Sequence, residues 1–274
     1  MTADLRPTAH WIYAHPQSGS LNRQLFQAGA EALSARYDVQ TSDLYAQGFD
    51  PLLAQRDLGG REGNVVDLMG EVHERELVPE DVRLEQRKLE AAELLVFQFP
   101  LWWYGAPAIL KGWFDRVFTN GFAYGGVDAE TGLPLRYGEG GLTGKRALIV
   151  VTAGEDARSI GARGISGDID ALLFPITHGT LWYTGIESLD LHVIHDADTL
   201  DAAAVASERD RLTRRLAGIH EEAPSQPYRA LRDGDYRGTR ALRADILPGR
   251  TDLDIHRVDR ASRADRQAER RTPA

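Results

Sequence analysis

Short apolar runs alternate with helical periodicity along the first 220 residues. Five runs are predicted to be strands, at 9–14, 37–44, 94–99, 146–152 and 186–194. The third and fourth are almost wholly apolar, as is typical of parallel strands covered on both faces. Segments with a 3.6-residue apolar period predict helices at 22–36, 79–93, 107–118 and 199–219, and another that begins at 168–173. The polar segment 55–77 is expected to be a long excursion.

This alternation is typical of an α/β domain with a doubly wound, parallel five-stranded sheet. The expected strand order is 2-1-3-4-5, the flavodoxin-like pattern, in which ligands bind outside the carboxyl ends of the strands. Functional residues are therefore expected in the loops at 15–22, 100–106 and 153–167.

Hydrophobic periodicity fades after residue 222, which divides the chain into a domain of residues 1–222 and a C-terminal extension of residues 223–274. The net charge is −9, yet the extension carries twelve arginines against eight acidic residues. The acidic body argues against binding to nucleic acid. The extension is expected to lack a core of its own, and we hypothesise that it wraps a partner subunit.

Composition excludes several classes of protein. The hydrophobic fraction of 42% excludes wholesale disorder, and the absence of cysteine excludes disulfides, thiolate metal sites and a cysteine nucleophile. The longest uncharged run, 94–110, is broken by Pro100, Gly105 and Pro107, so it is too short to span a membrane. No secretory signal is evident at the N-terminus, and a cytoplasmic protein without integral membrane contact is expected.

The first loop, 15–22, leads directly into a predicted helix. It contains Ser18, Gly19 and Ser20, and hydroxyls and free N–H groups at a helix N-terminus favour binding of a phosphate. Ordinary capping by Ser20 or Asn22 is an equally good interpretation of these residues. Neither a G-x-G-x-x-G pattern nor a P-loop is present, so the usual basis for a nucleotide-binding Rossmann domain or a kinase is missing.

The second loop places Trp102, Trp103 and Tyr104 in succession at the end of a central strand. Core packing beneath the loop would explain one of these rings. Three rings in a loop bounded by glycine and proline are better explained by a flat ligand or a second subunit that covers them.

These motifs resemble those of a known family. The block 97–118, FQFPLWWYGAPAILKGWFDRVF, is similar to the signature of the NAD(P)H:quinone oxidoreductases, the DT-diaphorase family, and the resemblance extends to 121–124, 15–22 and 42–45. It covers the chain from about residue 9 to about residue 220. The resemblance implies a flavodoxin-like flavoprotein that reduces quinones or other electron-poor acceptors with NADH or NADPH, by ping-pong hydride transfer through flavin N5.

The resemblance also implies the residues of the site. It implies FAD, with FMN as the alternative, held at its pyrophosphate by His15, Ser20, Leu21 and Asn22. It places Leu101, Trp102, Trp103 and Tyr104 along the isoalloxazine ring, and Thr152, Ala153, Gly154 and Glu155 at the pyrimidine side. Trp103, Tyr104 and Gly154 would orient the flavin, whereas Trp103, Ala123, Tyr124 and Gly125 would contact the substrate. It further implies a homodimer whose active site forms at the interface.

The chain departs from the family pattern at three places. Ile160 and Ser166 stand where the mammalian enzymes have a tyrosine and a histidine near the flavin and the quinone. The Gly-Gly of the fourth-strand loop becomes Gly154-Glu155, and a tyrosine of the substrate pocket becomes Gly126. The catalytic proton donor is therefore left unassigned, and charge on the reduced flavin is expected to rest on backbone N–H groups near Gly154 and Glu155.

Two other functions stay open. Reduction of azo or nitro compounds would use the same residues, and a non-catalytic flavin-binding subunit of an ion-transport system would fit the loss of the tyrosine and the histidine. No metal is expected, because His192 and His195 lie on opposite faces of a predicted strand, where both are expected to be solvated. Asp115 and Arg116 are expected to be surface charges or charges that pair helices.

Overall fold

The computed structural model describes residues 6–224, 227–238 and 240–258. A parallel six-stranded sheet forms its centre, with the strand order β2-β1-β3-β4-β5 and with β6 also paired to β4, so the predicted fold class is confirmed. The strands of this sheet are β1 (Thr8–Tyr13), β2 (Asp38–Asp43), β3 (Ala92–Pro100), β4 (Arg146–Thr152), β5 (Glu187–Ser188) and β6 (His192–Ile194).

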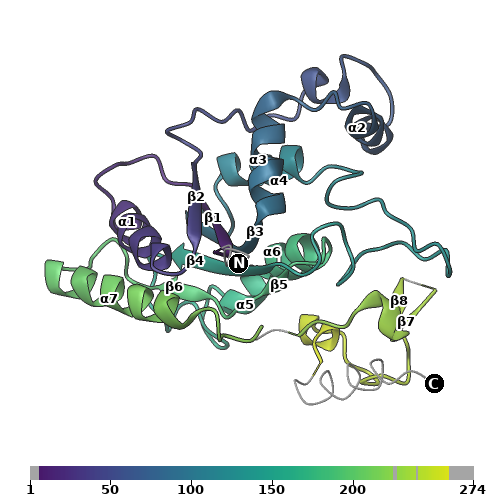
Figure 1. The fold of residues 1–274 in the computed structure, drawn as a ribbon. Coiled ribbons are helices and arrows are strands. Elements are labelled where there is room, and N and C mark those ends of the chain that lie inside the picture. Colours follow the sequence, from purple (N-terminus) through teal and green to yellow (C-terminus); the bar gives the residue numbers. More distant parts are fainter. Residues whose placement is uncertain (1–5, 225–226, 239, 259–274) are drawn as a thin grey trace, which may run out of the picture.

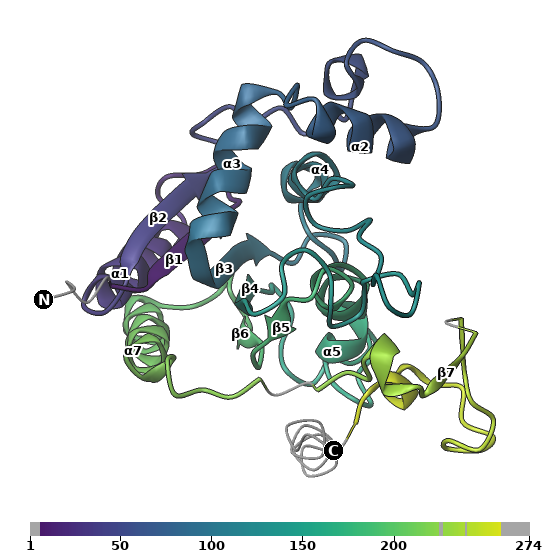
Figure 2. The ribbon, with the colours of Figure 1, turned by 45° about the vertical axis from the view of Figure 1, so that its right-hand side comes forward.

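Helices cover both faces of the sheet (Figures 1 and 2). One face carries α1 (Leu21–Ser34) and α7 (Ala202–Gly218), which pack side by side, and the other carries α3 (Glu80–Ala91) and α4 (Ala108–Val117). Two apolar cores result, one on each face, and β3 contributes Leu94 and Val96 to one and Leu95 and Phe97 to the other. This is why β3 is apolar at nearly every position. No helix of the described residues is long and apolar enough to cross a membrane.

Three predicted elements differ from the structure. The excursion at 55–77 contains a 3-10 helix (Gln55–Leu58) and α2 (Val65–Glu74), which begins after the cap Asn64. Val65 and Val66 stay exposed while Leu68 and Val72 are buried. Apolar residues therefore lie on more than one face of α2, and the helical period is obscured.

The helix predicted to begin at 168–173 is broken. It comprises α5 (Ile169–Leu172), α6 (Phe174–Ile176) and a π-helical segment (Thr177–Trp182). Pro175 has no N–H and cannot continue the helix that begins at Ile169. The predicted last strand is likewise divided into β5 and β6. Between them the carbonyl oxygen of Asp190 accepts a hydrogen bond of 2.6 Å from the Arg215 side chain of α7.

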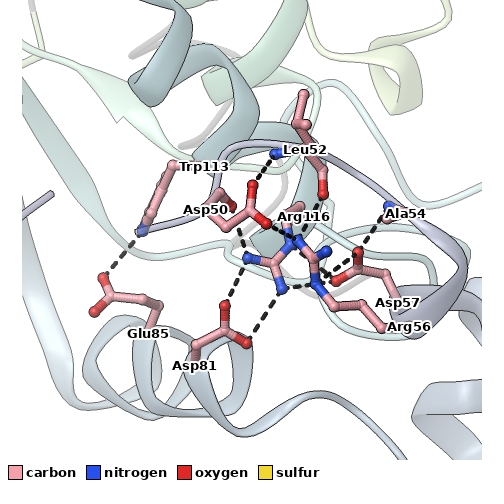
Figure 3. Close-up of polar contacts among 9 residues, drawn as sticks. All are labelled: Asp50, Leu52, Ala54, Arg56, Asp57, Asp81, Glu85, Trp113 and Arg116. Atoms are coloured by element: carbon pink, nitrogen blue, oxygen red, sulfur yellow. Dashed lines mark hydrogen bonds and ion pairs between the residues drawn. The ribbon is translucent and has the colours of Figure 1, made fainter. Parts of the chain in front are cut away.

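Arg116 on α4 is not a surface charge. Its side chain is fully buried, and its guanidinium donates to the carboxylates of Asp57 at 2.8 Å and Asp81 at 2.6 Å and to the carbonyl oxygen of Asp50 at 2.8 Å (Figure 3). Arg116 thus ties α4 to α3 and to the segment that precedes α2. Of the two predictions for this residue, the pairing of helices holds. Asp115 is exposed and pairs with Lys111.

A second buried polar cluster joins the sheet to α3 and α4. The Ser42 hydroxyl contacts His10 Nε2 at 2.8 Å and donates to the Glu85 carboxylate, which also accepts from Trp113 Nε1 at 3.0 Å. Burial and the nearby Lys88 lower the pKa of His10 to about 3, so the imidazole is neutral at pH 7. His192 was expected to be solvated, but it is buried as well. It lies on the edge strand β6, where Arg211 of α7 donates a hydrogen bond to the carbonyl oxygen of the adjacent Val193.

The described part of the C-terminal extension packs on its own chain. It contains two 3-10 helices (Leu231–Asp233 and Leu253–His256) and the hairpin of β7 (Tyr236–Arg237) and β8 (Ala241–Leu242). The buried Tyr228 hydroxyl lies 2.8 Å from Thr177 Oγ1, and Trp182 Nε1 donates to the carbonyl oxygen of Arg229 at 3.1 Å. Its buried residues therefore pack against the π-helical segment. Residues 259–274 lie outside the described residues.

Candidate functional site

A crevice of about 330 Å³ opens where β1, β3 and β4 end. Parallel strands bring their carboxyl ends to one edge of a sheet, so three loops distant in sequence meet there. The lining includes His15, Ser20, Leu21, Asn22, Leu101, Trp102, Thr152 and Gly154, all of which were predicted, and also Gln17, Pro100, Ala197 and Asp198, which were not.

The N-terminus of α1 forms one wall of the crevice. Ser20, not Asn22, is the N-cap: its hydroxyl oxygen accepts from the N–H of Arg23 at 3.2 Å and donates to the carbonyl oxygen of Gln17 at 2.9 Å. The N–H groups of Leu21 and Asn22 have no acceptor among the hydrogen bonds of the described residues. Two free N–H groups at the positive end of a fourteen-residue helix are suited to an anion.

His15 adds a further donor to this wall. Its Nδ1 accepts from the N–H of Gln17 at 3.1 Å, which leaves the proton of the neutral ring on Nε2. Partial burial lowers the pKa of His15, so the neutral form dominates at pH 7. His15 is therefore a hydrogen-bond donor toward an anion and not a cation that pairs with it.

A chain of buried hydrogen bonds fixes this wall to the sheet. Trp11 Nε1 donates to Gln98 Oε1 at 3.1 Å, Gln98 Nε2 donates to the carbonyl oxygen of Asn22 at 2.7 Å, and Asn22 Nδ2 donates to Thr152 Oγ1 at 2.8 Å. The side chains of Asn22 and Thr152 are both 4% exposed. These two side chains join the loop before α1 to the end of β4. The side chain of Asn22 is therefore already occupied, and its backbone N–H is the group that is left to bind a ligand.

The aromatic turn, residues 101–105, forms the second wall. Trp103 and Tyr104 have φ values of 51° and 57°, which residues other than glycine rarely adopt. Trp103 is 97% exposed, whereas Trp102 and Tyr104 are 44% and 42% exposed, so core packing does not explain the three rings. The N–H groups of Trp103 and Tyr104 have no acceptor among the described residues. The turn therefore combines a rarely adopted backbone conformation, two free donors and an uncovered indole.

The loop after β4 forms the third wall and is tied to the aromatic turn. The Glu155 carboxylate accepts from the Tyr104 hydroxyl at 2.8 Å and from the Ser166 hydroxyl at 2.6 Å, and these two hydroxyl oxygens lie 3.2 Å apart. The hydrogen bonds from Ser166 and then Tyr104 lower the pKa of Glu155, which is ionised at neutral pH. The N–H groups of Gly154 and Glu155 also have no acceptor among the described residues.

Gly154 lies beside the exposed side chain of Asp198. A Cβ atom there would lie 2.6 Å from Asp198 Oδ2. Ala153, by contrast, offers no free group, because its side chain is buried, its N–H donates to Ile194 and its carbonyl oxygen accepts from Ala197. Ile160 is buried too.

Similarity to known proteins agrees with this geometry. The model of the family described as "Flavodoxin-like fold" matches residues 8–216. A ribosyldihydronicotinamide dehydrogenase-like protein, traD, of Penicillium crustosum is 40% identical, over 82% of this chain and 85% of its own length. The NAD(P)H dehydrogenase [quinone] 1 of Rattus norvegicus is 34% identical, over 78% of this chain and 77% of its own length. The chain belongs to this family of flavodoxin-like oxidoreductases.

A solved structure supports the same assignment. A proposed quinone reductase from Klebsiella pneumoniae is 38% identical and superposes with a TM-score of 0.86, over 92% of this chain and all of the other. The resemblance noted at 97–118 is thereby confirmed as family membership. The family model matches residues 8–216, and the superposition covers 92% of this chain, so the family's fold extends over the α/β domain.

Of the four predicted substrate residues, Trp103 belongs to the aromatic turn, whereas Ala123, Tyr124 and Gly125 do not line the crevice. Tyr124 lines a separate groove of about 340 Å³ and packs edge-on against Tyr183, with ring centroids 5.9 Å apart. Gly125 has a φ of 100°, and a Cβ atom there would overlap Asn120. Ala123 is fully buried, and its N–H and carbonyl oxygen are both used within the chain, so it has no group left for a substrate.

The predicted site residues do not include Gln17, Pro100, Ala197, Asp198 or Tyr183. Gln17 was within the predicted loop and could have been found by its place before the cap. Ala197 and Asp198 follow the last strand, β6, which the same rule about carboxyl ends would have included. Nothing in the sequence signals Tyr183, because its groove is assembled from α2, α4 and the π-helical segment.

Removal of the Trp103 ring tests the role of the aromatic turn. We expect Trp103→Ala to weaken flavin retention about tenfold while the free energy of unfolding of the apoprotein changes by less than about 0.5 kcal/mol, because a ring that is 97% exposed contributes little to folding. Trp103→Phe, which keeps a flat ring, should retain most of the affinity. Fluorescence titration of the apoproteins with FAD measures both variants. Equal retention of a yellow holoprotein by Trp103→Ala and the unaltered protein would contradict the placement of this turn beside the cofactor.

Proposed function

We propose that this protein reduces quinones and related electron-poor acceptors by two electrons, with NADH or NADPH as the donor and FAD as the cofactor. One observation supports the proposal: the crevice is lined by Leu21, Asn22 and Gly154, whose N–H groups have no acceptor among the described residues, and by Leu101 and Trp102 of the exposed aromatic turn. The N–H groups of Trp103, Tyr104 and Glu155, the next residues along the same two loops, have no acceptor there either. An anion site, a flat aromatic surface and a polar edge are the features that a flavin nucleotide requires. Relatives named as quinone dehydrogenases give the same substrate class.

Each wall of the crevice has a role in this proposal. The N–H groups of Leu21 and Asn22, with His15 Nε2, would hold the pyrophosphate. The turn of Trp103 and Tyr104 would lie along the ring system, and the N–H groups of Gly154 and Glu155 would hold its pyrimidine edge. A bound flavin would supply, through N5, hydride transfer between the nicotinamide and the acceptor in a ping-pong cycle.

The chain's own contribution is orientation and electrostatic support. Ile160 cannot donate a proton, and the Ser166 hydroxyl is committed to Glu155. We therefore assign no side chain as the general acid. The proton for the reduced acceptor would come from water, and the N–H groups of Gly154 and Glu155 would stabilise negative charge on a flavin held there.

We also propose a homodimer in the cytoplasm, where both nicotinamide nucleotides are supplied. The groove beside Tyr124 is bordered by exposed Val65 and Val66, apolar surface that a second copy would cover. Sedimentation velocity tests the assembly. A species of twice 30.3 kDa supports the dimer, and a species of 30.3 kDa at micromolar concentration excludes it.

One steady-state assay tests the activity. The purified protein, supplied with FAD, is mixed with NADH or NADPH and a menadione-type quinone, and oxidation of the nicotinamide is recorded. Parallel lines in double-reciprocal plots support the ping-pong cycle. If the rate stays at background with both donors and with quinone, azo and nitro acceptors, the proposed reductase activity is excluded. The non-catalytic flavin-binding role is then favoured. The mass of the cofactor released on denaturation distinguishes FAD from FMN.

A further inference from the structure

Glu155 carries a charge that no cation neutralises. No lysine, arginine or histidine nitrogen of the described residues lies within 4.0 Å of its carboxylate, and its partners are the hydroxyls of Tyr104 and Ser166. Hydrogen bonds from neutral hydroxyls stabilise the anion without cancelling its charge. The carboxylate therefore presents a full negative charge beside the aromatic turn.

The two hydrogen bonds also hold this charge in one place. Tyr104 belongs to the turn that we propose lies along the cofactor, and its hydroxyl is 2.8 Å from Glu155 Oε1. Ser166 holds the other carboxylate oxygen at 2.6 Å, so the side chain cannot swing into solvent without breaking both bonds. The Tyr104 ring therefore separates the backbone of the aromatic turn from a fixed carboxylate.

Neighbouring charges do not offset it. Asp156 is paired with the exposed Arg158, and that pair has no net charge. Asp198 adds a second carboxylate, which lines the crevice. Trp103 and Ile165, the sequence neighbours of the two residues that hold Glu155, are each 97% exposed. The surroundings of the aromatic turn are therefore apolar and anionic.

We infer that Glu155 is a specificity-determining residue that makes this site favour cationic acceptors over anionic ones. The inference rests on the proposed function, because it concerns the acceptor that would approach the cofactor held along the aromatic turn. A fixed charge at this range in a half-exposed site changes the relative binding of oppositely charged molecules by about tenfold for each sign. Neutral acceptors bind by their ring alone.

A set of acceptors built on one naphthoquinone tests the inference. The neutral parent, an anionic sulfonate and a cationic trimethylammonium derivative are compared in the FAD-loaded protein and in Glu155→Gln. The variant keeps the length of the side chain and an oxygen that can accept from Tyr104, and it removes the charge. Asp156→Asn is the matched control, because it removes the same formal charge from the neighbouring carboxylate, which binds Arg158 and has no hydrogen bond to Tyr104. The quantity measured is the ratio of kcat/KM for the cation to that for the anion.

We expect this ratio to exceed about tenfold in the unaltered protein, to fall by about tenfold in Glu155→Gln and to stay within about twofold in Asp156→Asn. Salt should reduce the ratio in the unaltered protein, because the charge is exposed to solvent on one side. Titration of the oxidised holoprotein with each quinone, followed by tryptophan fluorescence, gives the same ratio as dissociation constants without turnover.

The outcomes separate the two proposals. No turnover with any acceptor overturns the proposed function, and the binding ratios still test Glu155. Turnover without charge selectivity, or an equal ratio in the protein and in Glu155→Gln, overturns the inference and leaves the activity standing.

Discussion

Replacement of Ser20 by aspartate should abolish tight FAD binding without loss of the fold. Aspartate caps a helix as well as serine does, so α1 should keep its first turn. The substitution nevertheless places an anion beside the free N–H groups of Leu21 and Asn22, where we propose that the pyrophosphate binds. Repulsion between two anions at contact distance near a protein surface amounts to a few kcal/mol, so we expect the dissociation constant of FAD to rise by about 100-fold.

Ser20→Asn is the matched control for this prediction, because asparagine is an equally good cap without a charge. It should bind FAD within about threefold of the unaltered protein. Fluorescence titration gives the affinities, and thermal unfolding of the apoproteins shows whether the cap is preserved. Equal affinity of the aspartate and asparagine variants would exclude the N-terminus of α1 as the anion site.

Replacement of Arg116 by leucine should produce the largest loss of stability. The guanidinium is fully buried and donates to Asp57, which is 4% exposed, and to Asp81, which is 46% exposed (Figure 3). Without it, the buried Asp57 carboxylate would keep only the Ala54 N–H at 2.9 Å and the more distant Arg56 Nε at 3.9 Å. Removal of one member of a buried ionic network costs about 3–5 kcal/mol, because it strands a desolvated charge. For a chain of this length that corresponds to a fall in Tm of roughly 10 °C. Denaturant unfolding of the apoprotein measures the change.

Lys111→Leu is the control on the same helix. It breaks the ion pair between Lys111 and Asp115, whose side chains are 66% and 44% exposed respectively. Exposed ion pairs contribute about 1 kcal/mol or less to the free energy of unfolding. A triple variant, Arg116→Leu with Asp57→Asn and Asp81→Asn, should recover part of the loss, because the stranded charges are gone. A loss below about 1 kcal/mol in Arg116→Leu would show that water reaches the two carboxylates.

The glutamate that replaces the second glycine after β4 shows how the sequence and the structure complement each other. The sequence shows that Glu155 and Ser166 depart from the family pattern, and on that basis the proton donor was left open. Only the structure shows that the two residues meet each other and Tyr104, across 51 positions of sequence for the tyrosine and the glutamate. Spacing along the chain carries no information about that contact, because each loop's path depends on the strand beneath it.

Helices and strands were largely predictable where one face or both faces of the element are buried. β3 and β4 were recognised because strands covered on both faces must be apolar at almost every position. The break at Pro175 and the gap between β5 and β6 were missed. The helix break depends on Pro175, which has no N–H. The gap between the strands contains the carbonyl oxygen of Asp190, which accepts a hydrogen bond from Arg215 on α7.

The sequence by itself determined the order of strands and helices, the family and the loops that form the crevice, because periodicity, a contiguous motif and the geometry of parallel strands are local or topological properties. Tertiary structure alone decided that Arg116 is buried, that the described extension packs on its own chain, and that a fixed carboxylate stands beside the aromatic turn. Those outcomes depend on which distant groups meet and on whether water is excluded when they do, and neither is encoded in the spacing of residues along a chain.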